Sequence, residues 1–362
     1  MTYLDANASE PLHPAARAAV VAAMDNAGNP ASVHKAGRAQ RRVLETARET
    51  LALRFGAAPA DLVFTSGGTE ANALAVHALR TGRRIIVGAT EHDAVRAAAG
   101  PAAAILPVDA AGLADLAVLA SLLAEGPALV CLMLANNETG TIQPIARAAE
   151  LCHAAGALLH VDAVQAAGRI DVNLAALGAD SLAISSHKLA GPAGAGALLL
   201  TPAIAATLSP LIQGGGQERG RRGGTPPLPA IAGFAAAADR LDLSGGLATL
   251  RDAIEAAAVA AGGVVIGEAA MRLPNTSCLA LPGLRADTQV IALDLAGIAV
   301  SAGAACSSGR VARSHVLDAM GLGPLAGEAI RVSLPWNATE ADAAAFIRAY
   351  ADMASRLGRR AA

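Results

Sequence analysis

Aromatic side chains are scarce in this sequence. Only 2% of its 362 residues are Phe, Trp or Tyr, although 54% are hydrophobic. A core made without many aromatic rings must consist mainly of Ala, Val, Leu and Ile, which suits packed helices and buried parallel strands. The length exceeds that of one typical domain, so we expect two domains, or one large domain with an appendage. The composition therefore favours an α/β protein.

The sequence also lacks a strong net charge. Its formal charge is -2 and its pI is near 6.4, which gives no general field that attracts nucleic acid or an anionic membrane. The N-terminal stretch from Met1 to Pro11 is polar and acidic, without the basic and then apolar pattern of a secretory signal. We expect small-molecule chemistry in the cytoplasm, with no nucleic-acid or membrane partner.

Cysteine is rare, and its spacing excludes the common metal motifs. The four cysteines are Cys131, Cys152, Cys278 and Cys306, with no C-x-x-C pair and no His/Cys cluster at ligand spacing. A reducing compartment fits this pattern, and no metal site is expected.

Charge is absent from the run between residues 189 and 212. Such a run is long enough to cross a bilayer if it is helical. Proline at 192, 202 and 210, together with nearby glycines, interrupts a helix there. We predict a strand, a turn and a short helix instead.

Short apolar runs alternate with longer Ala-rich helical stretches, which is typical of parallel strands joined by crossover helices. The predicted strands are Leu62 to Thr65, Arg84 to Gly88, Leu129 to Leu134, Ala157 to Val161, Ser181 to Ser185 and Gly196 to Leu200. An amphipathic helix is predicted from Arg38 to Arg54 and another helix from about Pro229 to Leu241. We predict a domain boundary near residue 242.

Polar residues follow the predicted strands, at the edge where open parallel sheets bind ligands. After the first strand, Gly67 and Gly68 precede Thr69 and a helix. The glycines allow close approach of an anion, and the helix N-terminus with the Thr69 hydroxyl offers donors for a phosphate. Taken alone, the same motif is more often an ordinary turn and helix cap.

The later strands end in functional side chains as well. The second ends near His92, the third near Asn137, the fourth at Asp162 with Gln165, and the fifth at Ser185 with His187 and Lys188. Singly, these residues read as a surface histidine, an N-cap or a solvated lysine. Together they supply what pyridoxal phosphate (PLP) requires: a lysine amine, a carboxylate for the ring nitrogen, donors for the phenolate oxygen, a flat group over the ring and a phosphate cup.

These blocks, with others along the chain, make the sequence resemble a cysteine desulfurase of the class V aminotransferase family. The blocks include Tyr3-Leu4-Asp5, Gly28-Asn29-Pro30, the segments 64–70, 135–141, 160–165, 186–188 and 214–220, Pro274-Asn275-Thr276, the segment 314–317, and Ile330-Arg331-Val332-Ser333. They occur in order over nearly the whole chain.

The resemblance implies a role for each matching residue. Lys188 would form the internal aldimine and remove the Cα proton, while His92 would stack on the ring and assist proton transfer. Asp162 would pair with the pyridinium nitrogen and Gln165 with the phenolate oxygen. The phosphate would be held by Gly68, Thr69, Ser185 and His187, with Thr225 reaching in from the partner subunit of a homodimer.

For the substrate, the resemblance implies that Asn137 and Arg331 bind the carboxylate of L-cysteine, the arginine by a bidentate pair. Cys306 would take the sulfur as a persulfide and leave L-alanine. An acceptor protein, for iron–sulfur cluster, thio-cofactor or tRNA biosynthesis, would then receive that sulfur. The stretch from Ser301 to Gly309 is small and glycine-containing, which predicts a mobile exposed loop around Cys306.

The implied fold is the PLP-dependent transferase fold, with a large domain over residues 13–242 and a small α/β domain over 1–12 and 243–362. The large domain would hold a mostly parallel seven-stranded sheet. Two positions depart from the family pattern: Ser9-Glu10 replaces two threonines, and Pro226-Pro227 replaces Glu-Asn after Thr225. The alternatives are a selenocysteine lyase or other class V lyase or transaminase, and a PLP-fold partner protein that has lost its chemistry.

Overall fold

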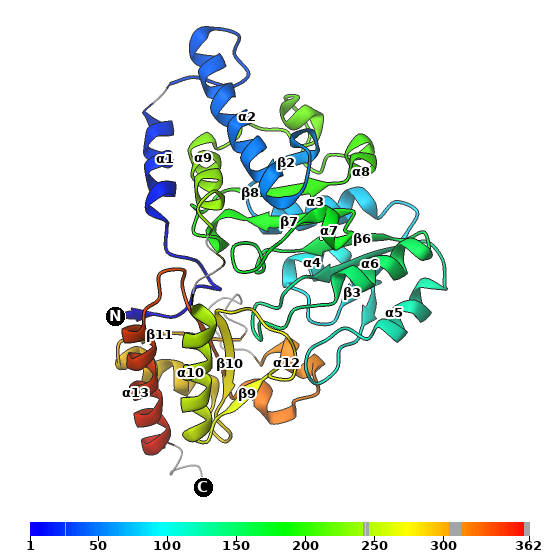
Figure 1. Ribbon diagram of the computed structural model, residues 1–362. Coiled ribbons are helices and arrows are strands. Elements are labelled where there is room, and N and C mark those ends of the chain that lie inside the picture. Colours follow the sequence, from blue (N-terminus) through cyan, green and yellow to red (C-terminus); the bar gives the residue numbers. More distant parts are fainter. Residues whose placement is uncertain (26, 242, 244–245, 304–312, 358–362) are drawn as a thin grey trace.

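The computed structural model describes residues 1–25, 27–241, 243, 246–303 and 313–357. Figure 1 shows two regions, one around a large central sheet and one around a smaller sheet below it, with the N-terminal segment running between them. Cys306, with residues 304–309 of the loop expected around it, lies outside the described residues.

The large sheet has seven strands in the order β2-β8-β7-β6-β5-β3-β4. β8 is antiparallel to both of its neighbours, and the other described pairings are parallel. The strands are β2 (Leu62–Thr65), β3 (Arg84–Gly88), β4 (Ala104–Leu106), β5 (Ala128–Met133), β6 (Leu158–Asp162), β7 (Ser181–Ser185) and β8 (Gly196–Leu200). The prediction of an α/β fold with a mostly parallel seven-stranded sheet is confirmed.

The six predicted strands are all present, and the ends of two of them, β5 and β6, move by one residue. The strand β4 was not predicted. It has three residues at the sheet edge, and its central Ile105 is 56% exposed. The apolar run that contains it begins with alanines, which do not distinguish a short strand from a helix.

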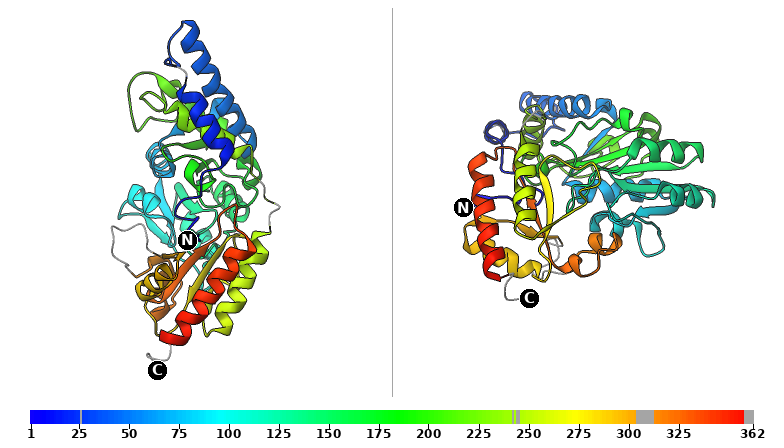
Figure 2. Two further views of the ribbon diagram at one scale, coloured as in Figure 1. Left: turned by 90° about the vertical axis from the view of Figure 1, so that its left-hand side faces the viewer. Right: turned by 60° about the horizontal axis from the view of Figure 1, so that its bottom comes forward.

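Helices cover both faces of this sheet, as two views in Figure 2 also show. They are α1 (Pro14–Met24), α2 (Lys35–Phe55), η1 (Pro59–Asp61), α3 (Gly68–Leu79), α4 (Asp93–Ala99), α5 (Leu116–Leu123), α6 (Ile145–Ala154), α7 (Leu174–Leu177), η2 (Ser186–Lys188), α8 (Pro202–Thr207), η3 (Gln217–Gly220) and α9 (Leu228–Ala238). Alternate residues of β5 join opposite cores: Val130 and Leu132 pack with α2, α5 and α6, whereas Leu129 and Cys131 pack with α3. A strand buried on both faces needs no polar alternation, which explains its continuous apolar sequence.

The helices predicted from periodicity are present with shifted ends. The helix expected from Arg38 to Arg54 is α2, which begins at Lys35 because the His34 side chain caps it. It ends at Phe55, and the next residue, Gly56, has the left-handed conformation (φ 74°). Left-handed backbone favours glycine, so Gly56 stops the helix there. The helix expected to run to Leu241 is α9, which ends at Ala238.

The smaller sheet is antiparallel, in the order β12-β13-β10-β9, and a two-stranded parallel pair joins β1 to β11. These elements are β1 (Thr2–Tyr3), β9 (Val264–Ile266), β10 (Thr276–Ala280), β11 (Ile298–Ala299), β12 (Ser301–Ala302), β13 (Ala329–Ser333), α10 (Leu247–Ala260), α11 (Ala286–Leu295), α12 (His315–Ala319), η4 (Gly323–Gly327) and α13 (Glu340–Leu357). For Ser301 and Ala302 the expectation of an exposed loop is wrong, because both are buried and paired with β13.

In the charge-free run from 189 to 212, the predicted strand and short helix are present as β8 and α8. The predicted turn between them is absent, because only Thr201 separates the two elements. Within the described part of the chain, no helix is long and apolar enough to cross a membrane.

Candidate active site

A cavity of about 270 Å³ opens at the edge of the large sheet where its parallel strands end. Nine of the predicted site residues line it: Gly68, Thr69, His92, Asn137, Asp162, Gln165, Ser185, His187 and Lys188. The parallel register explains this, because the carboxyl ends of β3, β5, β6 and β7 meet at one edge. Arg331 and Thr225 do not line the cavity, and Cys306 lies outside the described residues.

The start of α3 forms one wall of the cavity. A Cβ added at Gly68 would lie 2.6 Å from Cγ2 of Val164, so the close packing of helix and loop requires glycine there. The Ser185 hydroxyl is buried and has no hydrogen-bond partner among the described residues. With the unpaired N–H groups of the first helical turn, it offers donors to a bound phosphate.

Asp162 is the buried carboxylate of the cavity, 6% exposed at the end of β6. One carboxylate oxygen accepts a hydrogen bond from the Val164 N–H (2.9 Å) and the other from Nδ2 of Asn72 (2.7 Å). Burial raises the pKa of Asp162 above its usual value. The hydrogen bonds from Val164 and Asn72 and the charges of His92 and Lys188 oppose that rise. A cationic ring nitrogen in the cavity would offset the cost of burying the carboxylate.

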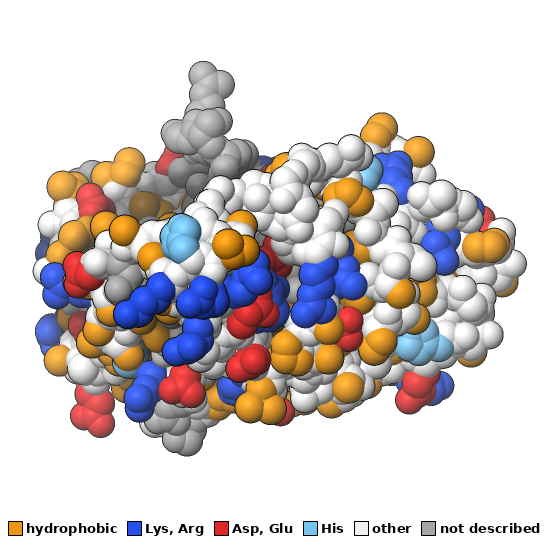
Figure 3. Space-filling model, turned by 90° about the horizontal axis from the view of Figure 1, so that it is seen from above, with side chains coloured by type: hydrophobic (Ala, Val, Ile, Leu, Met, Phe, Trp, Pro, Cys, Tyr) orange, Lys and Arg blue, Asp and Glu red, His pale blue; other side chains and the backbone are white. Residues whose placement is uncertain are grey.

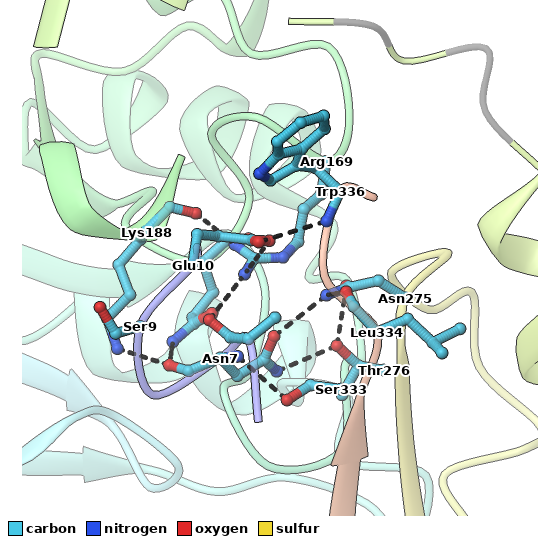
Figure 4. Close-up of polar contacts among 12 residues, drawn as sticks. Asn7, Ser9, Glu10, Arg169, Lys188, Asn275, Thr276, Ser333, Leu334 and Trp336 are labelled. Atoms are coloured by element: carbon cyan, nitrogen blue, oxygen red, sulfur yellow. Dashed lines mark hydrogen bonds and ion pairs between the residues drawn. The ribbon is translucent and has the colours of Figure 1, made fainter. Parts of the chain in front are cut away.

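Lys188 reaches into the cavity from η2, and the N-terminal segment holds it. Its Nζ donates to the carbonyl oxygen of Asn7 (Figure 4). It also donates to the carbonyl oxygen of Ala8 (3.0 Å). Nε2 of Gln165 donates to the same Asn7 carbonyl (2.9 Å), and its buried Oε1 has no partner among the described residues. The N-terminal segment therefore fixes two residues of the site.

Asn7 also ties the two sheets together at the cavity. Its Nδ2 donates to Oγ1 of Thr276 on β10 (3.0 Å) and to the carbonyl of Asn137 (3.1 Å), while Asn275 donates to its Oδ1 (3.2 Å) (Figure 4). No motif in the sequence points to Asn7, although it lies beside the Ser9-Glu10 departure.

Two histidines line the cavity. Nδ1 of His92 accepts a hydrogen bond from the Ala94 N–H (3.1 Å) and so caps α4. This bond fixes the orientation of the imidazole ring, and Nε2 is the ring nitrogen that does not take part in the cap. Burial, with the charges of Lys188 and Arg169, lowers the pKa of His187 to about 4. At neutral pH His187 is therefore uncharged, and its ring can donate one hydrogen bond.

Arg331 lies next to the cavity on β13 and is 3% exposed. Its Nη2 pairs with Oδ1 of Asp5 (2.7 Å) and its Nη1 donates to the Asn137 carbonyl (3.2 Å). Nε of Arg331 is buried without a partner among the described residues. The guanidinium is thus fixed beside Asn137 with donor capacity left for an anion.

Glu10, one of the two departures from the family pattern, forms a buried ion pair with Arg169. Oε1 of Glu10 lies 3.3 Å from Nη2 of Arg169, and the side chains are 6% and 3% exposed. Arg169 also donates to the carbonyl oxygens of Gln165 and Lys188 (both 3.0 Å), so the pair supports the backbone of two cavity residues.

We expect Glu10→Ala to lower the free energy of unfolding by about 3–5 kcal/mol, because it leaves the buried Arg169 charge without its carboxylate. Glu150→Ala is the matched control: it breaks the exposed Arg147 ion pair and should cost less than about 1 kcal/mol. Denaturant unfolding of both variants checks this. Equal losses in the two would contradict the structural role of the buried pair.

Thr225 is exposed within one chain, in the loop after η3. Arg222 of this loop pairs with Glu70 in the first turn of α3 (Nε to Oε1, 2.8 Å), so the ion pair holds the loop next to the start of α3. Pro226 lines a second cavity of about 440 Å³ between this loop and α2.

The described residues on the surface seen from above in Figure 3 form no large patch of one charge. Lys and Arg side chains gather there, but acidic side chains lie between them.

The three described cysteines are unsuited to nucleophilic chemistry. Cys131, Cys152 and Cys278 are 0%, 0% and 2% exposed. Burial raises the pKa of each thiol, for Cys152 to about 12, so the thiolate is disfavoured. In the described part of the chain, no group of His, Cys, Asp and Glu is arranged to hold a metal ion.

A lysine, a buried carboxylate and an anion cradle at one edge of a mostly parallel sheet define a PLP-dependent enzyme. Residues 2–346 match the aminotransferase class-V family, and the chain belongs to that family. The resemblance found in the sequence is thereby confirmed.

Relatives and solved structures carry more specific names. A cysteine desulfurase from Cereibacter sphaeroides is 42% identical over 359 residues, which are 94% of this chain and 92% of that protein. The structure of a NifS-like protein from Rickettsia africae ESF-5 has a TM-score of 0.91 and 34% identity, covering 98% of this chain and 99% of that one. The structure of SspA in complex with cysteine has a TM-score of 0.83 and 28% identity, covering 92% of this chain and 99% of that chain.

Proposed function

We propose that the protein is a cysteine desulfurase that converts L-cysteine to L-alanine and leaves the sulfur on Cys306. The observation that carries this is the convergence of Lys188, His92 and Asp162 on one cavity beside Arg331. Relatives named cysteine desulfurase support it, as does the related structure that holds cysteine. They do not favour the selenocysteine lyase or other class V lyase.

Different cavity residues would bind different parts of the cofactor. Bound PLP supplies an electron sink that weakens the bonds at Cα and Cβ of an amino acid. Asp162 would keep the ring nitrogen protonated, and Gln165 would contact the phenolate oxygen. The phosphate would be bound by Gly68, Thr69, Ser185 and His187.

Lys188 and His92 would move the protons. Nζ of Lys188 would hold the cofactor in the resting enzyme and, once released, take the Cα proton of the substrate. His92 would lie over the ring, and its Nε2, opposite the nitrogen that caps α4, would assist proton transfer.

Arg331 and Asn137 would bind the substrate carboxylate. Asp5 fixes one edge of the guanidinium, and Ser301 in turn donates to Asp5 (2.8 Å), so the arginine presents its remaining donors in a set direction. A carboxylate bound this way is held in the ground state and in the transition state alike.

Arg331→Ala should therefore mainly raise KM for cysteine, by about 10- to 100-fold, the value of a hydrogen-bonded charge. The visible absorbance of the bound cofactor should persist. Arg272→Ala is the matched control, since Arg272 forms an ion pair of comparable burial with Glu255 away from the cavity. An unchanged KM in the Arg331 variant would remove that residue from the substrate site.

Cys306 would receive the sulfur. Its thiolate would attack the sulfur of the substrate, forming an S–S bond as the Cβ–S bond breaks, and the electron pair of the broken bond would stay with the carbon skeleton, which is protonated to alanine. The burial of the other three cysteines supports this assignment. So does the register of β12, because Ser301, shortly before Cys306 in the chain, pairs with Arg331.

We further propose that the enzyme works as a cytoplasmic homodimer. Thr225 would reach the phosphate of the partner subunit, which accords with its exposure in one chain. The sulfur would pass to an acceptor protein for iron–sulfur cluster, thio-cofactor or tRNA biosynthesis. The domains would be 13–242, and 1–12 with 243–362, a division supported by Leu4 packing in the same core as β10 and α13.

The test of the proposed function is incubation of the purified protein with PLP and L-cysteine, with alanine and enzyme-bound sulfur measured together. We expect equal amounts of both in a single turnover. Alanine without bound sulfur would move the assignment to another class V activity.

A further inference from the structure

A line of three buried hydrogen bonds leads away from Asp162 into the protein. Nδ2 of Asn72 donates to Oδ2 of Asp162 (2.7 Å), and Oδ1 of Asn72 lies 2.9 Å from Nε2 of His160. Nδ1 of His160 lies 2.8 Å from Oγ of Ser181. Asn72, His160 and Ser181 are each at most 1% exposed, so water does not compete for these bonds.

The fold places these groups side by side from three separate elements. His160 and Asp162 are two residues apart on β6, so their side chains leave the same face of the sheet. Asn72 comes from α3, which covers that face, and Ser181 is the register partner of His160 on β7. The arrangement is thus set by the strand register and not by a flexible loop.

The direction of each bond follows from what the groups can donate. An ionised carboxylate only accepts, so Asn72 must turn its Nδ2 toward Asp162 and its Oδ1 toward His160. Nε2 of His160 then carries the proton, and its Nδ1 accepts from the Ser181 hydroxyl. Burial lowers the pKa of His160 to about 4, so the ring carries a single proton at neutral pH, as this direction requires.

We propose that Asn72, His160 and Ser181 are positioning residues that form a one-way hydrogen-bond relay, which orients Asp162 and stabilises its charge for the cofactor ring nitrogen. This inference rests on the proposed function. Every donor in the relay points toward Asp162, so each bond polarises the next and strengthens the last one. The bond from Asn72, the last in the relay, opposes the burial that raises the pKa of Asp162. Without that bond the carboxylate would more readily exist as the neutral acid.

The test measures the protonation of the ring nitrogen directly. Enzyme reconstituted with ¹⁵N-labelled PLP reports the protonated and neutral pyridine forms by the ¹⁵N chemical shift, and a titration gives the dissociation constant of PLP. For Asn72→Leu we expect a shift toward the neutral pyridine and a dissociation constant raised about tenfold or more, the value of a hydrogen bond to a charged group. The effect should be smaller for His160→Leu and smallest for Ser181→Ala, in order of distance from Asp162.

Two further variants separate this role from simple packing. His160→Gln keeps an amide N–H near the position of Nε2 and should recover most of the wild-type ¹⁵N shift. Cys131→Ala is the packing control. Cys131 pairs with His160 on the neighbouring strand, is equally buried and is not part of the relay. The ¹⁵N chemical shift of this variant should therefore match that of the wild type.

The outcomes distinguish the relay from the function itself. A wild-type enzyme that binds PLP without a protonated ring nitrogen, or does not bind it, would refute the proposed cofactor chemistry. A protonated wild type with unchanged ¹⁵N shifts in folded Asn72→Leu and His160→Leu would refute the relay alone. Equal shifts in His160→Leu and Cys131→Ala would assign the effect to packing and also refute it.

Discussion

Replacement of Cys306 by serine is expected to stop desulfuration while cysteine still binds to the cofactor. A serine hydroxyl is a poor nucleophile toward sulfur, and the three other cysteines are too buried to replace Cys306. Alanine production should fall by at least about 10³-fold, in keeping with the loss of an enzyme nucleophile. The spectral change on adding cysteine should remain, because Lys188, Asp162 and the phosphate cradle are unaltered.

Intact-protein mass spectrometry after one turnover gives the decisive measurement. The wild-type protein should gain the mass of one sulfur atom, and peptide mapping should place it on Cys306. Cys131→Ala and Cys152→Ala are the controls and should gain the same mass as the wild type. Full turnover in Cys306→Ser, or the added sulfur on any other cysteine, would overturn the assignment of the nucleophile.

Lys188→Ala should abolish activity and the covalent link to the cofactor. The variant would lose both the amine that we propose holds PLP and the proposed base for the Cα proton, and a positioned base alone contributes about 10²–10⁴-fold. The purified wild type should be yellow, and borohydride should fix the cofactor to the protein irreversibly. In the variant, PLP should wash out after the same treatment.

The chain offers a clean control for this experiment, since Lys35 and Lys188 are its two lysines. Lys35 is exposed at the first position of α2, so Lys35→Ala should keep its colour and its borohydride-stable label. Peptide mapping then has only these two side-chain amines to distinguish. A label retained in Lys188→Ala would show that the lysine assignment is wrong.

The strands of the large sheet could be predicted because they are apolar runs bounded by polar or glycine residues. Ser181–Ser185 and Gly196–Leu200 are buried on both faces, and their ends match the prediction. The two-stranded pair of β1 and β11 could not be found this way. These strands have two residues each and lie far apart in the sequence, so neither carries a periodic signal of its own.

The cavity residues were predictable for the same reason that the large sheet was. Once the strands are known, parallel topology brings Asp162, Ser185 and Lys188 to one edge. Arg331 and Cys306 followed only from the family resemblance. β13 is as long as β7, but Arg331 at its centre interrupts the apolar run that would signal a strand. Asn72 and His160 were missed, since one lies on a helix and the other inside a strand, and nothing in a single sequence pairs them.

The dependence of the cavity on the N-terminal segment has a consequence for synthesis on the ribosome. Asp5 can pair with Arg331 only after the ribosome has added the 326 residues that separate them. At about 5–20 residues per second, this synthesis takes roughly 15–65 s. During that time Asn7 has neither Thr276 nor Asn275 to hold it. The large sheet can form meanwhile, but the nascent enzyme has no complete site for sulfur chemistry until synthesis has passed β13, which delays persulfide formation until the chain is almost finished.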